Sequence, residues 1–457
     1  MNVVQRNKSN FSKKLFTLIL PITFQQFMLA LVSASDALML GMLSQDELSA
    51  VSLAGQITFV ENLFLAAMTI GLSMLASQYW GKKDLVSVEK IFGYIMKVTA
   101  EISFLFFAVS LAMPDILMRI FTNEESLISG GAIYLRTVSL SYFLTGISQI
   151  YLCILKNSSK AITASIISSV SVVLNIFMNA VFIFGLLGFP KLEIAGAALA
   201  TVIAKLIEVV WCVAETLKKG SIHLKLRYIV HSDKLLKNDF WKYTLPVLGN
   251  QIAWGVGFTM YSVIMGHLGT DAVAANSLAN ILKNLIVCLC VGLGSGGGII
   301  VGNELGAGNL DTAKAYGRKL CHLAIIFGII SGFIMLMLSP LILKFGNLSD
   351  TANHYLKWMI IMCSVYMVGK FINATTIGGI FCAGGDSKFG LICDTITMWC
   401  ITVPIGFFVA FVLKLPVLVV YLIINIDEVI KLPAVYKHYK KYLWVKDLTT
   451  KTEERNV

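Results

Sequence analysis

Residues Leu31 to Ala54 have the sequence LVSASDALMLGMLSQDELSAVSLA, and this stretch decides the class of the fold. Up to Leu43 it is an apolar run in which Asp36 is the single charged residue. A short polar segment, 44–47, separates it from a second apolar run. A bilayer core about 30 Å thick is crossed by about 20 apolar helical residues. The stretch therefore predicts the end of one membrane span and the beginning of the next.

The whole chain has the composition of a membrane protein. Hydrophobic residues make up 57% of its 457 positions, charged residues only 14%, and the mean hydropathy is +0.78, whereas soluble domains have about 25% charged residues. We therefore predict an all-α integral membrane protein. Its twelve transmembrane helices are expected near 15–43, 50–79, 93–113, 133–155, 161–187, 194–214, 243–268, 276–303, 319–343, 355–382, 389–413 and 415–434.

The two halves of the chain repeat each other. A shift of 225 residues places LGMLSQDELSAVSLA opposite MGHLGTDAVAANSLA, Pro21 opposite Pro246 and Gly81 opposite Gly306. Each half holds an even number of spans, so two pseudo-symmetric six-helix lobes in the same orientation are expected, and transporters built from such repeats bind substrate between them. The predicted domains are an N-lobe (1–214), a basic cytoplasmic linker (215–242), a C-lobe (243–434) and a basic cytoplasmic tail (435–457).

The loop charges predict the orientation. If the N-terminus is cytoplasmic, most Lys and Arg residues fall in cytoplasmic loops and tails, which favours both termini inside. The opposite loops hold only Arg119, Arg136, Lys191, Lys344, Lys357 and Lys414. The net charge of +11 does not indicate nucleic acid, because no basic patch interleaved with aromatics stands apart from the apolar segments; lipid headgroups are the expected anionic partner.

Asp36 is the strongest candidate for a functional residue. An ionisable group at bilayer depth costs several kcal/mol unless it faces a cavity or a partner. On a helix, Gln25, Leu29, Val32 and Asp36 share one face, and Pro21 lies where it can bend that helix. The alternative is a buried, protonated aspartate that only holds a neighbouring helix by a hydrogen bond.

The fifth predicted span carries a second polar stripe. Ser168, Ser171, Asn175 and Asn179 are spaced 3, 4 and 4 and share one helix face, while Thr201 lies in the sixth span. Together with Asp36, these oxygens could surround a proton or a hard cation such as Na⁺. Such stripes also hold helices together without further function, so both readings stay open.

A third stripe lies on the seventh predicted span. Its members are Gln251, Trp254, Phe258, Tyr261 and Met265. This face suits the stacking of planar organic cations, although packing is the more common meaning of such a pattern.

Several other charged residues lie within the predicted spans. Local ion pairs are expected for Lys97 with Glu101, for Asp427 with Lys431 and for Lys205 with Glu208. Four residues have no local partner and must line a cavity, pair across helices or snorkel: Glu61, Lys283, Lys370 and Asp394.

Several motifs, taken in order and spacing, resemble those of the multidrug and toxic compound extrusion (MATE) transporters. They are VSASDALMLGMLSQDELSAVSLA, ASQYWGKKD, LNIFMNAVFIFG, EIAGAALATVIAK, FCAGGDSKF and WCITVPIGFF. The resemblance covers roughly residues 15–445. It implies two six-helix lobes of the MATE/MOP type around a central cavity, and export of cationic or amphipathic organic compounds by antiport with Na⁺ or H⁺.

The resemblance also implies roles for single residues. Asp36, Asn175 and Thr201 match the family's cation site in the N-lobe. Asn179 departs, because the DinF-like branch has an aspartate at that position. The NorM-like branch has acidic residues on helices seven and ten, which 243–268 and 355–382 lack. Coupling is therefore expected in the N-lobe, nearer the DinF-like arrangement.

The expected protein is a secondary active multidrug exporter in a bacterial cell membrane, a monomer without cofactor apart from the coupling ion. Asp36, Asn175, Asn179 and Thr201 would bind the ion, and helix one would bend at Pro21. The residues expected to line the substrate cavity are Gln25, Gln251, Trp254, Phe258, Tyr261, Lys283 and Lys370. A lipid-linked precursor flippase of the same superfamily is the alternative. An enzyme is not expected, since HExxH, GxSxG and P-loop motifs are absent from the sequence.

Overall fold

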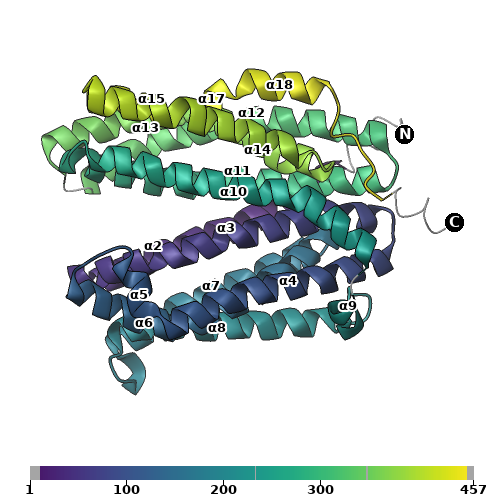
Figure 1. Cartoon of the computed structure of the whole chain (residues 1–457), viewed down its shortest axis with the longest axis horizontal. Coiled ribbons are helices and arrows are strands. Elements are labelled where there is room, and N and C mark those ends of the chain that lie inside the picture. Colours follow the sequence, from purple (N-terminus) through teal and green to yellow (C-terminus); the bar gives the residue numbers. More distant parts are fainter. Residues whose placement is uncertain (1–10, 232, 346–347, 450–457) are drawn as a thin grey trace. The chain divides into compact units, whose positions relative to one another are not determined.

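The computed structural model describes residues 11–231, 233–345 and 348–449, and this part of the chain is helical with no strand (Figure 1). Arg6, Lys8 and residues 450–457, on which the predicted orientation partly rests, lie outside the described residues, as does the side chain of Lys344. The predicted all-helical fold is therefore confirmed for the described part.

The helices of the first half are η1 (Leu15–Ile19), α2 (Leu20–Gly41), α3 (Gln45–Gly81), α4 (Leu85–Ala112), α5 (Pro114–Arg119), α6 (Glu125–Asn157), α7 (Ala161–Phe184), η2 (Leu186–Gly188), α8 (Glu193–Thr216) and α9 (Leu226–Val230). Those of the second half are α10 (Lys234–Gly266), α11 (Thr270–Gly306), α12 (Leu310–Phe345), α13 (Asp350–Asn373), η3 (Ala374–Phe381), α14 (Ser387–Thr395), η4 (Ile396–Thr402), α15 (Val403–Phe407), η5 (Phe408–Val412), α16 (Val417–Ile424), α17 (Asp427–Ile430) and α18 (Leu432–Lys440).

Ten helices in the described residues are long and apolar enough to cross a membrane, and each corresponds to a predicted span. The two other predicted spans are helical as well. In α10, Asn250 and Gln251 lower the hydropathy of the membrane-length part. The last span consists of α16, which has only eight residues, followed by α17 after a break at Asn425.

The internal repeat is present in the helix boundaries. Helices α3 and α11 both have 37 residues and begin 225 positions apart, at Gln45 and Thr270. The turns that follow them contain a left-handed residue at equivalent positions, Lys83 (φ 65°) and Gly308 (φ 76°). The two halves thus repeat in backbone conformation as well as in sequence.

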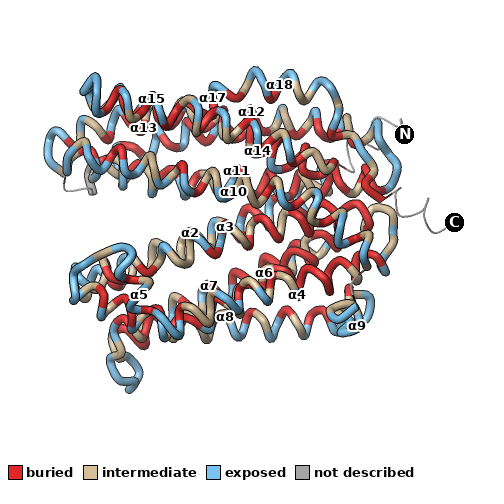
Figure 2. Tube along the Cα trace, viewed as in Figure 1, coloured by how far each residue is buried: buried red, intermediate tan, exposed pale blue. Residues whose placement is uncertain are grey.

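Contacts divide the chain into two compact units. The N-terminal unit comprises residues 27–76 and 84–241, and the C-terminal unit comprises the described parts of 1–26, 77–83 and 242–457. Buried residues run along α6 in the N-terminal unit (Figure 2). Contacts thus group 11–26 and 77–83 with the second half of the chain, and the predicted domain boundaries stay a prediction.

The first helix changes geometry just before its proline. The π-helical segment η1 ends at Ile19, and Pro21 is the second residue of α2. Proline has no N–H for the carbonyl four residues earlier, and its ring crowds that carbonyl, which widens or bends the preceding turn. The predicted irregularity at Pro21 is therefore seen in the backbone, while its role as a hinge remains a prediction.

Inside the C-terminal unit, the ends of α3 and α11 cross at two glycines. A methyl group on Gly81 would overlap the backbone oxygen of Asn303, and one on Gly306 would overlap that of Gln78. Asn303 is the repeat equivalent of Gln78, so the crossing is made twice by equivalent residues. Only glycine permits so close an approach of two helix backbones.

Candidate functional site

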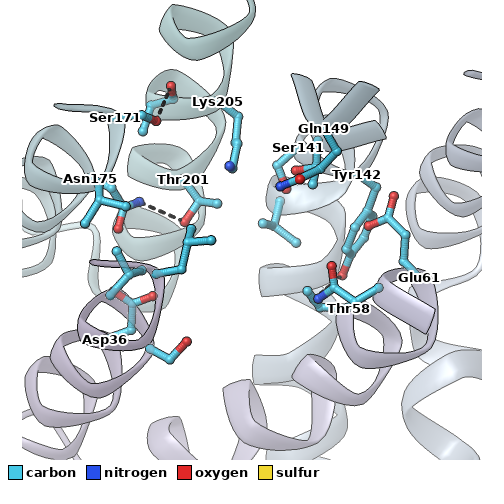
Figure 3. A pocket seen from close by; sticks show the side chains of 18 of the residues that line it. Asp36, Thr58, Glu61, Ser141, Tyr142, Gln149, Ser171, Asn175, Thr201 and Lys205 are labelled. Atoms are coloured by element: carbon cyan, nitrogen blue, oxygen red, sulfur yellow. Dashed lines mark hydrogen bonds between the residues drawn. The ribbon is translucent and has the colours of Figure 1, made fainter. Parts of the chain in front are cut away.

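The N-terminal unit contains a partly open cavity of about 320 Å³, lined by residues of α2, α3, α6, α7 and α8. Figure 3 shows its polar side chains on two facing walls, with Asp36, Asn175 and Thr201 on one and Thr58, Glu61 and Tyr142 on the other. Leu29 and Val32 line it as well, as expected from their place on the Asp36 face of the helix. Asp36, which has no charged neighbour in its apolar stretch of sequence, therefore faces this cavity.

The structure brings together the four residues predicted to bind the coupling ion. Asn179 Nδ2 donates to Asp36 Oδ1 at 2.5 Å and lies 3.3 Å from Asn175 Oδ1. Asn175 Nδ2 in turn donates to Thr201 Oγ1 at 3.2 Å. Asp36, Asn175 and Thr201 line the cavity, whereas Asn179 is fully buried behind them.

Asp36 has no basic partner among the described residues; its hydrogen bond comes from the neutral amide of Asn179. A charge that faces a polar cavity without an ion pair can bind a cation from outside, because no described residue neutralises it permanently. Asn179 Oδ1 is buried and has no hydrogen-bond partner in the described part of the chain. The cluster therefore contains one carboxylate without an ion pair, that of Asp36, and one oxygen without a hydrogen bond, Asn179 Oδ1.

The opposite wall was not predicted. Glu61 lines the cavity together with Thr58 one turn earlier on α3, and Tyr142 and Gln149 project from α6. Tyr142 Oη lies 3.4 Å from Thr58 Oγ1. The sequence singled out Glu61 as unpartnered, but it gave no signal for the other three residues, because one polar residue per turn in an apolar helix is too weak a pattern.

Lys205 also lines the cavity and forms the expected local pair with Glu208, with Nζ 3.0 Å from Oε1. The other two local pairs are present too. Lys97 and Glu101 lie at 4.0 Å, and Lys431 and Asp427 at 3.6 Å.

The aromatic stripe lies on α10 in the C-terminal unit. Trp254 and Phe258 are stacked, with ring centroids 5.6 Å apart and an interplanar angle of 14°. Tyr261 Oη lies 2.5 Å from Thr402 Oγ1. Met265 is buried, so it belongs to the core and not to the aromatic face.

The two lysines of this unit have different surroundings. Lys370 Nζ lies 3.0 Å from Glu428 Oε1 and 5.6 Å from the ring centroid of Trp254. Lys283 Nζ lies 5.8 Å from the ring centroid of Phe258 and 5.6 Å from that of Tyr366. Lys370 is therefore paired across helices, whereas Lys283 has aromatic rings as neighbours and no ion pair in the described part of the chain.

Lys370 belongs to a buried cluster of ion pairs that was not predicted as a whole from the sequence. Lys431 Nζ lies 2.8 Å from Asp394 Oδ1 and 3.2 Å from Glu428 Oε2. Asn250 Nδ2 donates to Asp394 Oδ2 at 2.9 Å. Asp394 thus pairs across helices, one of the three alternatives left open for it.

None of the seven residues predicted to line the substrate cavity lines the cavity of the N-terminal unit. Gln25 is buried in the C-terminal unit, and its Oε1 has no partner in the described part of the chain. Gln251 on α10 is only partly buried and belongs to the same unit. Their contact with substrate stays a prediction.

Comparison with known protein families identifies the chain. The family model MatE matches it twice, over residues 21–181 and 246–408, which is more than half of its length. The chain belongs to the MatE family. The two matches begin 225 residues apart, which is the shift that aligns the two halves of the sequence.

Curated relatives match nearly the whole length of this chain. The "Uncharacterized transporter YisQ" of Bacillus subtilis is 23% identical over 436 residues, 94% of each chain. The "Probable multidrug resistance protein YoeA" of the same organism is 23% identical and covers 90% of this chain and 89% of its own. Among solved structures, a MOP superfamily transporter from Pyrococcus furiosus matches with a TM-score of 0.86 at 16% identity, covering 95% of this chain and 96% of its own.

These findings settle the class of the protein. It is a multi-pass membrane transporter of the MATE family, with bacterial relatives named for multidrug resistance, and its two-lobe fold is that of the solved MATE structures. The family consists of transporters and not of enzymes. Placement in the DinF-like branch stays a prediction.

Proposed function

We propose that the protein is a secondary active exporter that exchanges cationic or amphipathic organic compounds for protons, with Asp36 as the residue that binds the coupling ion. The observation that carries this proposal is the position of Asp36: an unneutralised carboxylate on a polar cavity, inside a MATE transporter. Small-molecule drugs as substrates agree with the multidrug names of the relatives.

The donors around Asp36 favour a proton over Na⁺. Na⁺ is a hard cation that is best held by several oxygens, at least one of them charged. Here the group nearest to the carboxylate is the Asn179 N–H, a donor that occupies one of the directions from which a cation would approach. The oxygens of Thr201 and Asn175 already take part in hydrogen bonds, which leaves Asn179 Oδ1 as the one neutral oxygen of these side chains without a hydrogen bond among the described residues. Na⁺ remains the alternative that the experiment below tests.

The exchange follows from the charge of one side chain. When Asp36 is ionised, it attracts a cationic substrate to the cavity and accepts the Asn179 hydrogen bond. A proton that binds to the carboxylate removes the charge and weakens both interactions, since hydrogen bonds to charged groups are the stronger ones. Helix α2 is then free to bend at η1 and Pro21, which changes the shape of the cavity and releases substrate.

The aromatic face of α10, in the C-terminal unit, suits planar organic compounds. The stacked rings of Trp254 and Phe258 offer a flat apolar surface for a planar compound. A flippase for pyrophosphate-linked lipids would need free cationic groups. Lys370 is neutralised by Glu428, which leaves Lys283, beside two aromatic rings, as the only one of these two lysines without an ion pair among the described residues; a single lysine gives that alternative little support.

The test is transport in proteoliposomes driven separately by a pH gradient and by a Na⁺ gradient, with a fluorescent organic cation as substrate. We expect the pH gradient to drive transport and Asp36→Asn to abolish it. Asp46→Asn is the matched control, because it makes the same change at the exposed start of α3. Unchanged transport by Asp36→Asn would refute the role of Asp36, and transport driven by Na⁺ alone would refute the choice of ion.

A further inference from the structure

Glu61 is the second carboxylate of the cavity, and the proposed exchange at Asp36 does not involve it. It lies on α3 and lines the same space as Asp36, from the facing wall (Figure 3). Only 1% of its surface is exposed, and Oε1 has no hydrogen-bond partner among the described residues. A buried carboxyl oxygen without a partner is costly, which calls for a ligand that satisfies it.

The lysine that acts on Glu61 is already engaged in an ion pair. Lys205 acts on the Glu61 carboxyl through space, but its Nζ pairs with Glu208 Oε1 at 3.0 Å. Ser103 on α4 and Tyr142 on α6 are the other polar groups that interact with Glu61. Neither carries a positive charge; the Ser103 hydroxyl approaches the Glu61 carboxyl as a neutral donor and cannot balance its charge.

The charges around the cavity are therefore unbalanced. With all groups ionised, the cavity lining carries two negative charges, on Asp36 and Glu61, and one positive charge, on Lys205. Lys205 is also paired with Glu208. Isolated charges do not persist in a low-dielectric interior; they take up a proton or a counter-ion. A metal ion would need several oxygens directed at it. The hydroxyls of Thr58 and Tyr142 lie 3.4 Å from one another and are hydrogen-bonded to each other instead. A proton needs only the carboxyl itself.

We propose that Glu61 is a second proton-binding site of the cavity, so that each cycle of export exchanges the substrate for two protons. A cationic substrate in the cavity stabilises the ionised forms of both Asp36 and Glu61. When it leaves, each carboxylate binds one proton, and the buried charge of Glu61 disappears. This inference rests on the proposed proton antiport and adds its stoichiometry.

The stoichiometry is measured as the substrate ratio across proteoliposome membranes at equilibrium, with the membrane potential held at zero. One proton per substrate gives about a tenfold change of this ratio per pH unit, and two protons give about a hundredfold change. We expect about a hundredfold for the unmodified protein and about tenfold for Glu61→Gln. Glu47→Gln, the same change on the same helix but outside the cavity, should keep the unmodified value.

A second measurement does not require transport. Substrate added to the purified protein in weakly buffered detergent should release two protons, and the number should fall to one in Glu61→Gln and remain two in Glu61→Asp. Equal proton release or equal slopes in the unmodified protein and Glu61→Gln would overturn the inference. Failure of proton antiport itself would look different, because no variant would then accumulate substrate in response to a pH gradient.

Discussion

Asp36 is held by one amide, and the chemistry of that amide sets which ion can bind. Asn179 Nδ2 lies 2.5 Å from Asp36 Oδ1 and is fully buried. An aspartate would have nearly the same shape as the asparagine but would present an oxygen in place of a donor. We therefore expect the ion selectivity of this chain to depend directly on the identity of residue 179.

Asn179→Asp should make transport depend on Na⁺. Two carboxylates at this distance cannot both ionise unless a cation lies between them, and a second charged oxygen favours a hard metal ion. We expect a Na⁺ gradient to drive substrate uptake into proteoliposomes with the variant. Asn179→Ala, which removes the donor without adding a charge, is the control; if it gained the same Na⁺ dependence, the added carboxylate would not be the cause.

Glu428 should be important for stability. Its carboxylate contacts Lys370, Lys431 and Asn373 Nδ2, all in the interior of the C-terminal unit. Glu428→Gln leaves Lys370 without its carboxylate, and breaking a buried pair costs about 3–5 kcal/mol. Unfolding in detergent, followed by tryptophan fluorescence, measures this loss. Asp311→Asn removes an exposed pair with Lys314 and should cost less than about 1 kcal/mol; similar losses in both variants would contradict the expectation.

The sequence predicted the Asp36 wall better than the Glu61 wall, for a physical reason. Asn175 and Asn179 repeat at helical spacing, so their common face is visible in the sequence. Glu61 is the single carboxylate of a long apolar stretch, and which way it points depends on the rotation of α3. That rotation is fixed by packing against other helices, as in the cluster that contains Ala54 and Leu135.

At the scale of elements, helix ends are fixed by local signals that the sequence displays. Asp84 caps α4 by accepting a hydrogen bond from Ser87 N at 3.1 Å, and Gly185 ends α7 in the left-handed conformation. The ion cluster around Lys431 has no such signal. Its partners lie on separate helices, as Asp394 does on α14, and only tertiary packing brings them together.

The crossing of α3 and α11 should not tolerate a side chain. Gly81→Ala forces the two backbones apart, because the added methyl group overlaps Asn303, and such overpacking costs about 1–3 kcal/mol. We expect a lower midpoint of thermal unfolding in detergent. Gly55→Ala on the same helix has open space around it and should stabilise the helix by up to about 1 kcal/mol. If Gly55→Ala were as destabilising as Gly81→Ala, the crossing would not explain the effect.

The start of α10 should be sensitive to acid. Burial alone would raise the pKa of Asp233, but hydrogen bonds from Lys90 and from the Leu235 backbone N–H outweigh it, so the pKa lies below its ordinary value. A depressed carboxyl pKa stabilises the fold above the unfolded-state pKa of about 4, and the contribution is lost as pH falls through the folded-state pKa.

Thermal unfolding of the unmodified protein and Asp233→Asn between pH 7 and pH 3 tests this linkage. The unmodified protein should be the more stable at pH 7, and the difference should shrink as the pH falls below about 4. A difference that stays constant over the whole range would mean that ionisation of Asp233 contributes nothing.

For the whole molecule, the repeat made the fold predictable. The number of spans, their division into two sets of six and the alignment of Pro21 with Pro246 all follow from the sequence, and the double family match begins at these two positions. The sequence could not place the cavity in one unit, since its lining comes from five helices. Side chains on different helices meet only when crossing angles and rotations are set by packing.

The orientation in the membrane is open to a direct test. Lys219 and Leu187 are both exposed and lie in the segments that follow α8 and α7. The excess of Lys and Arg predicts that residue 219 is cytoplasmic and residue 187 external. In a variant without native cysteines, a membrane-impermeant maleimide added to intact cells should label Leu187→Cys but not Lys219→Cys. The reverse pattern would invert the assigned topology.

The glycine crossing of α3 and α11 also bears on the origin of the chain. Gly81 approaches the backbone of Asn303, and Gly306 approaches the backbone of its repeat equivalent, Gln78. This is the reciprocal pattern of a two-fold symmetric dimer. Before duplication, a half-length polypeptide would have met a second copy of itself at this point through a single ancestral residue. Any larger side chain at that residue would have overlapped the backbone of the second copy at both ends of the contact, so a single substitution would have opposed assembly twice.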